Sequence, residues 1–438
     1  MLLLDRQLAE PWAKGLGWAG LVGGGLAFVP FLGQPGEMES ASPKGPLHGV
    51  RVADLSTVVM GPLAARILAD LGADVIKIEP PGGEMTRQIG QSHNEGMTPL
   101  AINVNRNKRS VVLDLKSPDG RQAALDLIAT CDVFVTNMRL KALDRLGLGY
   151  ESVSAVRPDI VYGAGTGFGS DGPYRDKPAY DDVIQAVSGL ASVFNLTDDQ
   201  PRFIPSIVAD KVASLHVVYA ILAALFRRST TGEGDFVEIP MAESLATFNL
   251  VEHLSGLTFD PPLGAFSYER VRSTQRRPRR SADGWICILP YSNANWRDFF
   301  TLAGCPEIAD DERFATISSR LTHVDALYSH LDEIMIKRTT AEWIADCDRL
   351  SIPAVPVVDL EYIDQDPHFE AVGLLESHVH PSEGPYRVIR DPVTFRSGNP
   401  GLYRHAPSAG QHTEEVLRQI GYSPEQIEAL GSDSSSAE

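Results

Sequence analysis

The chain has 438 residues, more than one hydrophobic core usually fills, so we expect two domains or one large domain with a smaller insertion. Hydrophobic residues make up 43% and charged residues 22%, which is typical of a fully folded globular protein. The formal net charge of -18 repels nucleic acids and anionic membrane surfaces and argues against both as partners, so a phosphate-bearing ligand must bind at a local basic patch.

The N-terminal region contains an apolar, glycine-rich run at residues 17–32, which follows Arg6 and Lys14 as a signal or anchor segment would. The run is short for a membrane-spanning helix, and no clear small-residue cleavage site follows it. We therefore interpret residues 1–45 as an N-terminal extension, either disordered or the product of a misassigned start, rather than as a membrane anchor.

The next block of sequence alternates between strand and helix patterns. HGVRVADLS (48–56) predicts a strand, Gly61 and Pro62 open a helix that ends at Gly72, and ADVIKIE (73–79) predicts a second strand. This alternation predicts an α/β fold with a parallel sheet, right-handed crossovers and covering helices. Further strands are expected at 109–116, 131–137, 159–167 and 236–240, with helices from about 117 and after Asp210.

The remaining sequence predicts a smaller mixed domain and a C-terminal return. A strand is expected in RSADGWICILP (280–290), and two short helices in 413–430. We predict a large α/β domain at 46–240, a linker helix at 241–258, a small α+β domain at 259–365, a return linker at 366–394, a C-terminal segment packed on the large domain at 395–432, and a disordered tail at 433–438.

Two sequence features exclude familiar classes of site. The turn STVVMGP (56–62) has only Gly61, whereas a dinucleotide-binding fold normally carries GxGxxG there. The four cysteines form neither CxxC pairs nor a cluster with histidines, so we expect no metal, no disulfide framework and a cytoplasmic protein.

Two acidic positions precede predicted helices. Asp210, in SIVADKVAS (206–214), is either a structural N-cap or a nucleophile that forms a mixed anhydride with an acyl group, helped by nearby amides that stabilise the oxyanion. Tyr180 and Asp181 precede a second helical pattern, in which Asp181 or Asp182 has the same structural interpretation.

Basic residues gather in two segments of this acidic chain. They are either solvated surface or, near the carboxyl ends of the strands, a site for a ligand with several phosphates. The arginine-rich segment 269–284 contributes likewise or tethers domains. The cluster comprises Arg106, Lys108, Arg109, Lys116, Arg139, Lys141 and Arg145.

Taken together in their order, several segments resemble family III coenzyme A transferases, a group that includes formyl-CoA transferase, carnitine CoA-transferases and α-methylacyl-CoA racemase. The resemblance runs from about residue 46 to 430 and is carried by residues 45–87, 105–120, 133–150, 177–190, 208–241 and 276–285. It implies a Rossmann-like large domain, a smaller α+β domain and an interlocked, ring-like homodimer. It also implies an acyl-CoA donor, a small carboxylate acceptor and no permanently bound cofactor.

The resemblance assigns roles to individual residues. It identifies Asp210 as the catalytic aspartate, which takes an acyl group and then carries CoA as a thioester, with Tyr180 and Asp181 beside the reaction centre. It implies that the CoA thioester, as substrate, contacts Val58, Val59, Lys116, Asn137, Met138, Ala142, Arg145 and Leu146.

Two departures and one substitution refine this resemblance. Formyl-CoA transferase carries a glutamine where this chain has Val59, and its long glycine-rich loop is missing here, so specificity for formate or oxalate is not implied. The racemase branch has a histidine where this chain has Tyr180, so the resemblance favours transfer over racemisation. The alternatives are an α-methylacyl-CoA racemase or epimerase, and a non-catalytic CoA-binding protein.

Overall fold

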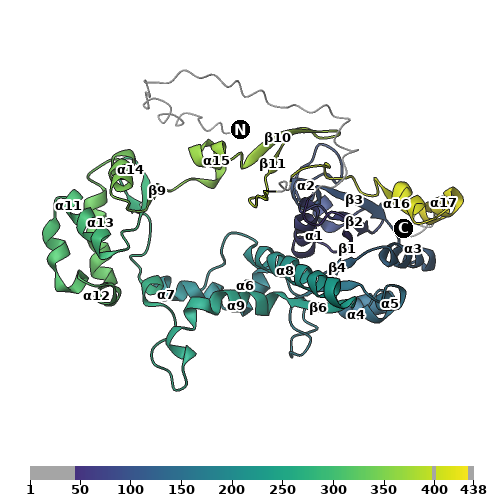
Figure 1. The fold of residues 1–438 in the computed structure, drawn as a ribbon, viewed down its shortest axis with the longest axis horizontal. Helices are drawn as coiled ribbons and strands as arrows, with labels where there is room; N and C mark the ends of the chain where they lie inside the picture. Colours follow the sequence, from purple (N-terminus) through teal and green to yellow (C-terminus); the bar gives the residue numbers. More distant parts are fainter. Residues whose placement is uncertain (1–44, 397–400, 433–438) are drawn as a thin grey trace, which may run out of the picture. The chain divides into compact units, whose positions relative to one another are not determined.

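The computed structural model describes residues 45–396 and 401–432, so the predicted extension and tail lie largely outside the described residues. A six-stranded sheet in the order β3-β2-β1-β4-β5-β6 forms its first block, and every pairing in it is parallel (Figure 1). This is the strand order of dinucleotide-binding Rossmann folds, so the predicted α/β class is confirmed. The strands are β1 Arg51–Leu55, β2 Asp74–Glu79, β3 Lys108–Val112, β4 Val133–Thr136, β5 Val161–Thr166 and β6 Asp235–Pro240.

Helices cover both faces of this sheet because successive strand residues point to opposite sides. Val133 belongs to the core formed with α1 (Met60–Asp70) and α8 (Val208–Thr231). Its neighbour Phe134 belongs to the other core, formed with α3 (Pro118–Ala129) and α5 (Tyr150–Val156). Sheets buried on both faces explain the nearly continuous apolar strands of the sequence.

A separate core lies around a three-stranded sheet in the order β7-β8-β9 (Arg279–Arg280, Trp285–Ile288 and Ala354–Pro356). Strand β10 (Leu375–His380) pairs with β11 (Gly384–Ile389) in an antiparallel hairpin. The other helices are α2 Pro99–Asn105, α4 Leu140–Arg145, α6 Asp181–Val187, α7 Asn195–Asp198, α9 Met241–His253, α10 Glu269–Arg272, α11 Asn293–Leu302, α12 Ile317–Thr322, α13 Val324–Met335, α14 Thr340–Arg349, α15 Pro367–Ala371, α16 Thr413–Gln419 and α17 Pro424–Ser432.

Helix α8 is, within the described ranges, the one helix long and apolar enough to cross a membrane. Its composition has a different explanation in the fold, because Ala213, Val217 and Ile221 are at most 1% exposed in the core shared with α1. The opposite side of the helix exposes Leu215 and Tyr219 at 59% each.

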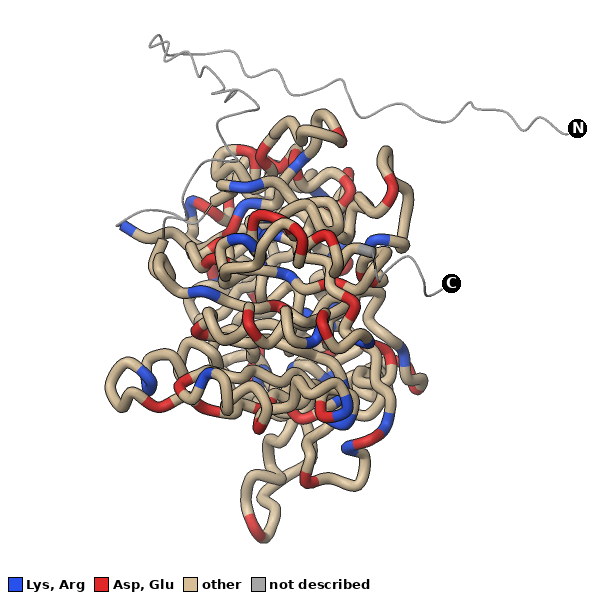
Figure 2. Tube along the Cα trace, turned by 90° about the vertical axis from the view of Figure 1, so that its right-hand side faces the viewer, with Lys and Arg blue, Asp and Glu red and all other residues tan. Residues whose placement is uncertain are grey.

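Acidic residues outnumber basic ones, 57 to 39, and Figure 2 shows both kinds spread over the part of the chain that is drawn as a coloured tube. A basic patch must therefore arise from local clustering rather than from composition. Several basic side chains are instead buried in ion pairs, as described below.

Candidate active site

A cavity of about 700 Å³ opens at the carboxyl ends of β1, β4, β5 and β6. Strands β2 and β3 are added on one side of β1, and β4, β5 and β6 on the other, so a topological switch point lies between β1 and β4. Ligands of open α/β sheets bind at such a switch point. The cavity is lined by Thr57, Val58, Met60, Met85, Asn137, Met138, Arg139, Leu140, Lys141, Ala142, Arg145, Gly165, Thr166, Gly167, Phe168, Ser170, Arg175, Asp176, Lys177, Pro178, Ala179, Tyr180, Asp210, Glu238 and Met241.

The loop from β1 to α1 forms one wall of the cavity. Asn137, directly after the end of the neighbouring strand β4, holds the backbone of this loop in place. The Asn137 amide donates to the Thr57 carbonyl at 2.8 Å, and its oxygen accepts from the Thr57 amide at 2.8 Å. Both polar ends of this side chain are therefore engaged with the loop. Asn137 supports the wall of the cavity as well as lining it.

Val58 has a left-handed backbone conformation, with φ at +66°. This is a rare conformation for a β-branched residue, because its branched Cβ crowds the following carbonyl. Such strained residues persist only where the surroundings hold them, and they concentrate at functional sites. The strain at Val58 is an independent sign that this loop serves a site.

Asp210 lies in α8 at its third residue, and the N-cap position belongs to Ile207, which makes no side-chain cap. The N-cap interpretation of Asp210 is therefore wrong, because the helix begins two residues earlier, at Val208. Asp210 instead accepts a hydrogen bond through Oδ1 from the backbone amide of Met60, at 3.1 Å. Since Met60 is the first residue of α1, this carboxylate lies at the positive end of another helix.

Asp181 is the first residue of α6, and Tyr180 holds the N-cap position, so neither Asp181 nor Asp182 is an N-cap. The Asp181 Oδ2 atom accepts from the backbone amide of Asp210 at 3.0 Å. Its Oδ1 atom accepts from Gln185 Nε2 at 2.6 Å. Asp181 is 6% exposed, whereas Tyr180 is 62% exposed and lines the cavity.

The electrostatics of this pair favour a reactive carboxylate. The pKa of Asp210 is raised to about 6, mainly by burial and also by the nearby Asp181 carboxylate, while the hydrogen bond from the Met60 amide opposes the increase. A carboxyl with this pKa is ionised at neutral pH but is less stabilised, and so more basic, than an ordinary aspartate. Strongly shifted groups in a cavity are candidates for catalysis.

Basic side chains surround part of the cavity. Arg139, Lys141 and Arg145 line it, as the phosphate-site interpretation predicted. Arg175 and Lys177 also line it, and sequence reasoning missed them although they lie in the same turn-rich stretch as Tyr180.

The other members of the predicted basic cluster do not line the cavity. Arg106 pairs with Asp70 at 2.7 Å, Lys108 with Asp54 at 2.8 Å, and Arg109 with Asp74 at 2.6 Å. These three basic side chains are buried, and their acidic partners lie on β1, β2 and α1. They therefore stabilise the fold. In the arginine-rich segment, Arg277 and Arg279 pair with Asp332.

The predicted CoA contacts divide into two groups. Val58, Asn137, Met138, Ala142 and Arg145 line the cavity. The residues predicted to contact CoA that are not among the lining residues are Val59, which is 4% exposed, Lys116, which is exposed, and Leu146, which packs in the core.

The opposite wall contains residues that the sequence did not single out. Glu238 on β6 accepts from Thr166 Oγ1 at 3.2 Å and from Ser170 Oγ at 2.7 Å. Met241 and Phe168 supply apolar surface. In the sequence, only their positions could have indicated a role in the site, since each lies at or near the end of a strand, where a parallel sheet binds its ligands.

Other site classes find no support in the described ranges. No group of three or more His, Cys, Asp or Glu side chains there could hold a metal ion. All four cysteines are unpaired.

Comparison with known proteins identifies the family. The model of CoA-transferase family III matches residues 47–413. The chain belongs to CoA-transferase family III.

The similarity of this family III CoA-transferase to several named relatives extends over nearly the whole length of each relative. A succinate–glutarate CoA-transferase of Agrobacterium fabrum is 32% identical over 86% of this chain and 96% of its own. A formyl-CoA:oxalate CoA-transferase of Rhodopseudomonas palustris is 30% identical over 87% and 95%. A probable fatty acyl-CoA transferase of Mycobacterium tuberculosis is 32% identical over 87% and 99%.

Solved structures agree with this family III CoA-transferase assignment. The crystal structure of a CaiB/BaiF family protein from Brucella suis matches with a TM-score of 0.73 and 30% identity, over 86% of this chain and 99% of that one. Membership of this family implies a CoA thioester as substrate.

Proposed function

We propose that this enzyme is an acyl-CoA:carboxylate CoA-transferase that works through covalent intermediates on Asp210. The Asp210 carboxylate attacks the thioester carbonyl of an acyl-CoA, the C–S bond breaks, and an aspartyl-acyl anhydride and CoA thiolate form. The thiolate then attacks the aspartyl carbonyl and releases the donor carboxylate, which leaves an aspartyl-CoA thioester. An acceptor carboxylate attacks that thioester, the C–S bond breaks, and a second aspartyl-acyl anhydride and CoA thiolate form. The thiolate attacks the acceptor carbonyl of this anhydride, releases the acceptor as its acyl-CoA and regenerates the Asp210 carboxylate.

The contact between Asp210 Oδ1 and the Met60 amide carries this proposal. If Asp210 attacks through its other oxygen, Oδ1 becomes the carbonyl oxygen of the anhydride and of the thioester. Each later attack on that carbonyl places negative charge on Oδ1. A backbone amide at a helix N-terminus is already directed at that oxygen, which is how oxyanions are stabilised.

Asp181 and Tyr180 have supporting roles in the proposed reaction. Asp181 anchors the backbone of Asp210 and raises its pKa, so that it keeps the nucleophile oriented and basic. Tyr180 places an exposed phenol in the cavity, where its hydroxyl is suited to bind the carboxylate of donor or acceptor.

Intact-protein mass spectrometry tests the covalent route. We expect a hydroxylamine-labile CoA adduct after incubation with a panel of acyl-CoAs, including succinyl-CoA. Absence of an adduct with every donor would contradict the proposal. Exchange of the α-proton for deuterium without an acceptor would instead indicate a racemase, and tight CoA binding without any adduct would indicate a binding protein.

The rate of adduct formation should depend on the ionisation of Asp210, whose pKa is raised to about 6. Only the ionised carboxylate attacks, so we expect the single-turnover rate to fall about tenfold for each pH unit below that pKa. Asp181→Asn removes the neighbouring charge and keeps an acceptor for the Asp210 amide. This variant should therefore shift the acid limb to lower pH, and an unchanged limb would show that Asp181 does not raise the pKa.

The basic side chains that line the cavity, among them Arg139 and Arg145, should bind the phosphates of CoA. We expect the double variant Arg139→Ala/Arg145→Ala to raise KM for the acyl-CoA by about tenfold or more, with kcat changed less than about twofold. Its KM should also depend less steeply on salt, because fewer ion pairs form. Arg418→Ala, which removes an exposed arginine of α16 outside the cavity lining, is the matched control. A KM equal to that of the control would contradict the assignment.

We also infer a homodimer and a cytoplasmic location. Apolar side chains on the outer faces of α6, α8 and α9 support the dimer, because exposed patches of this kind usually bind a partner. The unpaired cysteines fit a reducing compartment. The exposed apolar residues are Val183, Val187, Leu215, Tyr219, Phe226, Phe248 and Val251.

A further inference from the structure

The strained loop at the wall of the cavity is held through its backbone by side chains from three other segments, namely β2, the turn after β2 and the end of β4. Besides the Asn137 clamp on Thr57, Lys77 Nζ donates to the Ser56 carbonyl at 2.8 Å. The amide of Val58 donates to Glu84 Oε2 at 3.1 Å. The residue in the left-handed conformation is thus fixed by a carboxylate that is not among the cavity-lining residues.

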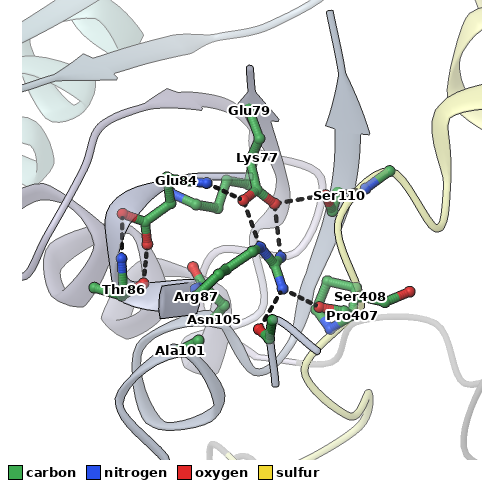
Figure 3. Close-up of polar contacts among 12 residues, drawn as sticks. Lys77, Glu79, Glu84, Thr86, Arg87, Ala101, Asn105, Ser110, Pro407 and Ser408 are labelled. Carbon is green, nitrogen blue, oxygen red and sulfur yellow. Dashed lines mark hydrogen bonds and ion pairs between the residues drawn. The ribbon is translucent and has the colours of Figure 1, made fainter. Parts of the chain in front are cut away.

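Glu84 is itself held rigidly, as Figure 3 shows. It is 3% exposed, its carboxylate accepts from the Thr86 amide at 3.1 Å, and it also accepts from the Thr86 hydroxyl. Its own amide donates to Glu79 Oε2 at 3.2 Å. Glu79 in turn binds Arg87 through two bonds, of 2.6 and 2.7 Å.

The charges beneath the loop balance, which explains how they can be buried together. Three basic and three acidic side chains, each at most 4% exposed, form the group. Burial of ions is tolerated only when they are paired and hydrogen-bonded, so the group resists rearrangement. Its members are Lys77, Lys108, Arg87, Asp54, Glu79 and Glu84.

We propose that Glu84 is a positioning residue for Asp210, which it serves through the loop rather than by touching it. By holding the amide of Val58, Glu84 keeps the residue before the N-cap of α1 in its left-handed conformation. The Met60 amide, two residues further on, is thereby directed at Asp210 Oδ1. The expected effect of Glu84 on kcat rests on the proposed transferase function, whereas its effect on the conformation of the loop does not.

The first experiment compares three variants in kcat and KM for adduct formation. Glu84→Ala should lower kcat by about tenfold to a hundredfold with KM changed less than about threefold, since a misplaced oxyanion donor affects mainly the transition state. Glu84→Gln keeps an oxygen for the Val58 amide and should stay within about threefold of the wild type. Thr86→Val removes the hydroxyl bond to the same carboxylate but keeps the bond from the Thr86 amide, and it serves as the matched control, with kcat expected within about threefold.

The second experiment tests whether Glu84 acts through Val58. Glycine adopts a positive φ without strain, so in a Val58→Gly background the loss caused by Glu84→Ala should shrink to about threefold or less. An undiminished loss in that background would overturn the proposal, and so would a Glu84→Gln variant as slow as Glu84→Ala.

Hydrogen exchange separates this proposal from the transferase proposal. In the wild-type enzyme the Val58 amide should be strongly protected, and a peptide spanning residues 56–62 should exchange at least about tenfold faster in Glu84→Ala. An unprotected Val58 amide in the wild type would overturn the positioning role even if Glu84→Ala fails to fold. Absence of a wild-type CoA adduct would overturn the transferase proposal alone.

Discussion

Replacing Asp210 by asparagine is expected to abolish the CoA adduct and to lower kcat by at least about 10⁴-fold, because the amide keeps the shape of the side chain but is not a nucleophile. The Met60 amide can still donate to the asparagine oxygen, so the loss would report chemistry rather than a collapsed site. Steady-state transfer and intact mass measured on the same preparation check this. A variant with more than a few per cent of wild-type turnover would rule out Asp210 as the nucleophile.

The stability of the same variant provides an internal control. The folded-state pKa of Asp210 lies above its ordinary value of 3.8, so the unfolded chain loses this proton first as the pH rises. The folded state therefore loses stability as the pH rises from 3.8 to about 6, and the full cost of ionised Asp210 is present at pH 8, so Asp210→Asn should unfold there at the same or a higher urea concentration. A clearly less stable variant would indicate a structural role.

Replacing Lys108 by methionine is expected to lower the free energy of unfolding by about 3–5 kcal/mol, because it leaves a buried carboxylate without its closest cation. Lys108 and Asp54 are both 0% exposed, and Lys108 Nζ also donates to the Pro62 carbonyl at 2.9 Å. Burial would raise the pKa of Asp54, but the Lys108 and Lys77 ammonium groups hold it below its ordinary value. Urea unfolding followed by circular dichroism measures the change.

Two matched variants define the outcome of this experiment. Adding Asp54→Asn to Lys108→Met removes the unpaired charge and should recover part of the lost stability. Lys141→Met breaks the exposed pair with Asp176 and should leave the urea midpoint nearly unchanged, because water screens exposed ion pairs. A Lys108→Met variant no less stable than Lys141→Met would show that the buried pair contributes little.

The alternation of strands and helices was predictable from the sequence because each strand is a short apolar run and several helices carry local punctuation. Ser117 caps α3 ahead of Pro118, and Gly232 ends α8 with φ at +75°. The start of α8 was misplaced because Ile207, at its N-cap, carries no polar signal. Its position is held by two tertiary hydrogen bonds, from the Asp210 amide to Asp181 and from the Met60 amide to Asp210.

The candidate site was only partly predictable for a related reason. Asp210, Asn137 and Arg145 were identified by resemblance, and all three line the cavity. Arg109 and Lys108 could not be distinguished from Arg145 by sequence, because their acidic partners lie 35 and 54 residues away. The order of the strands in the sheet is needed to show which basic residues form ion pairs with acidic residues of the fold.

The bond between Met60 and Asp210 joins positions 150 residues apart, and its consequence concerns newly made chains. Until β1, α1 and α8 have assembled, the Asp210 carboxylate has neither its hydrogen bond from the Met60 amide nor its buried surroundings. With Asp210 as the nucleophile proposed above, we therefore expect incompletely folded chains to form no CoA adduct.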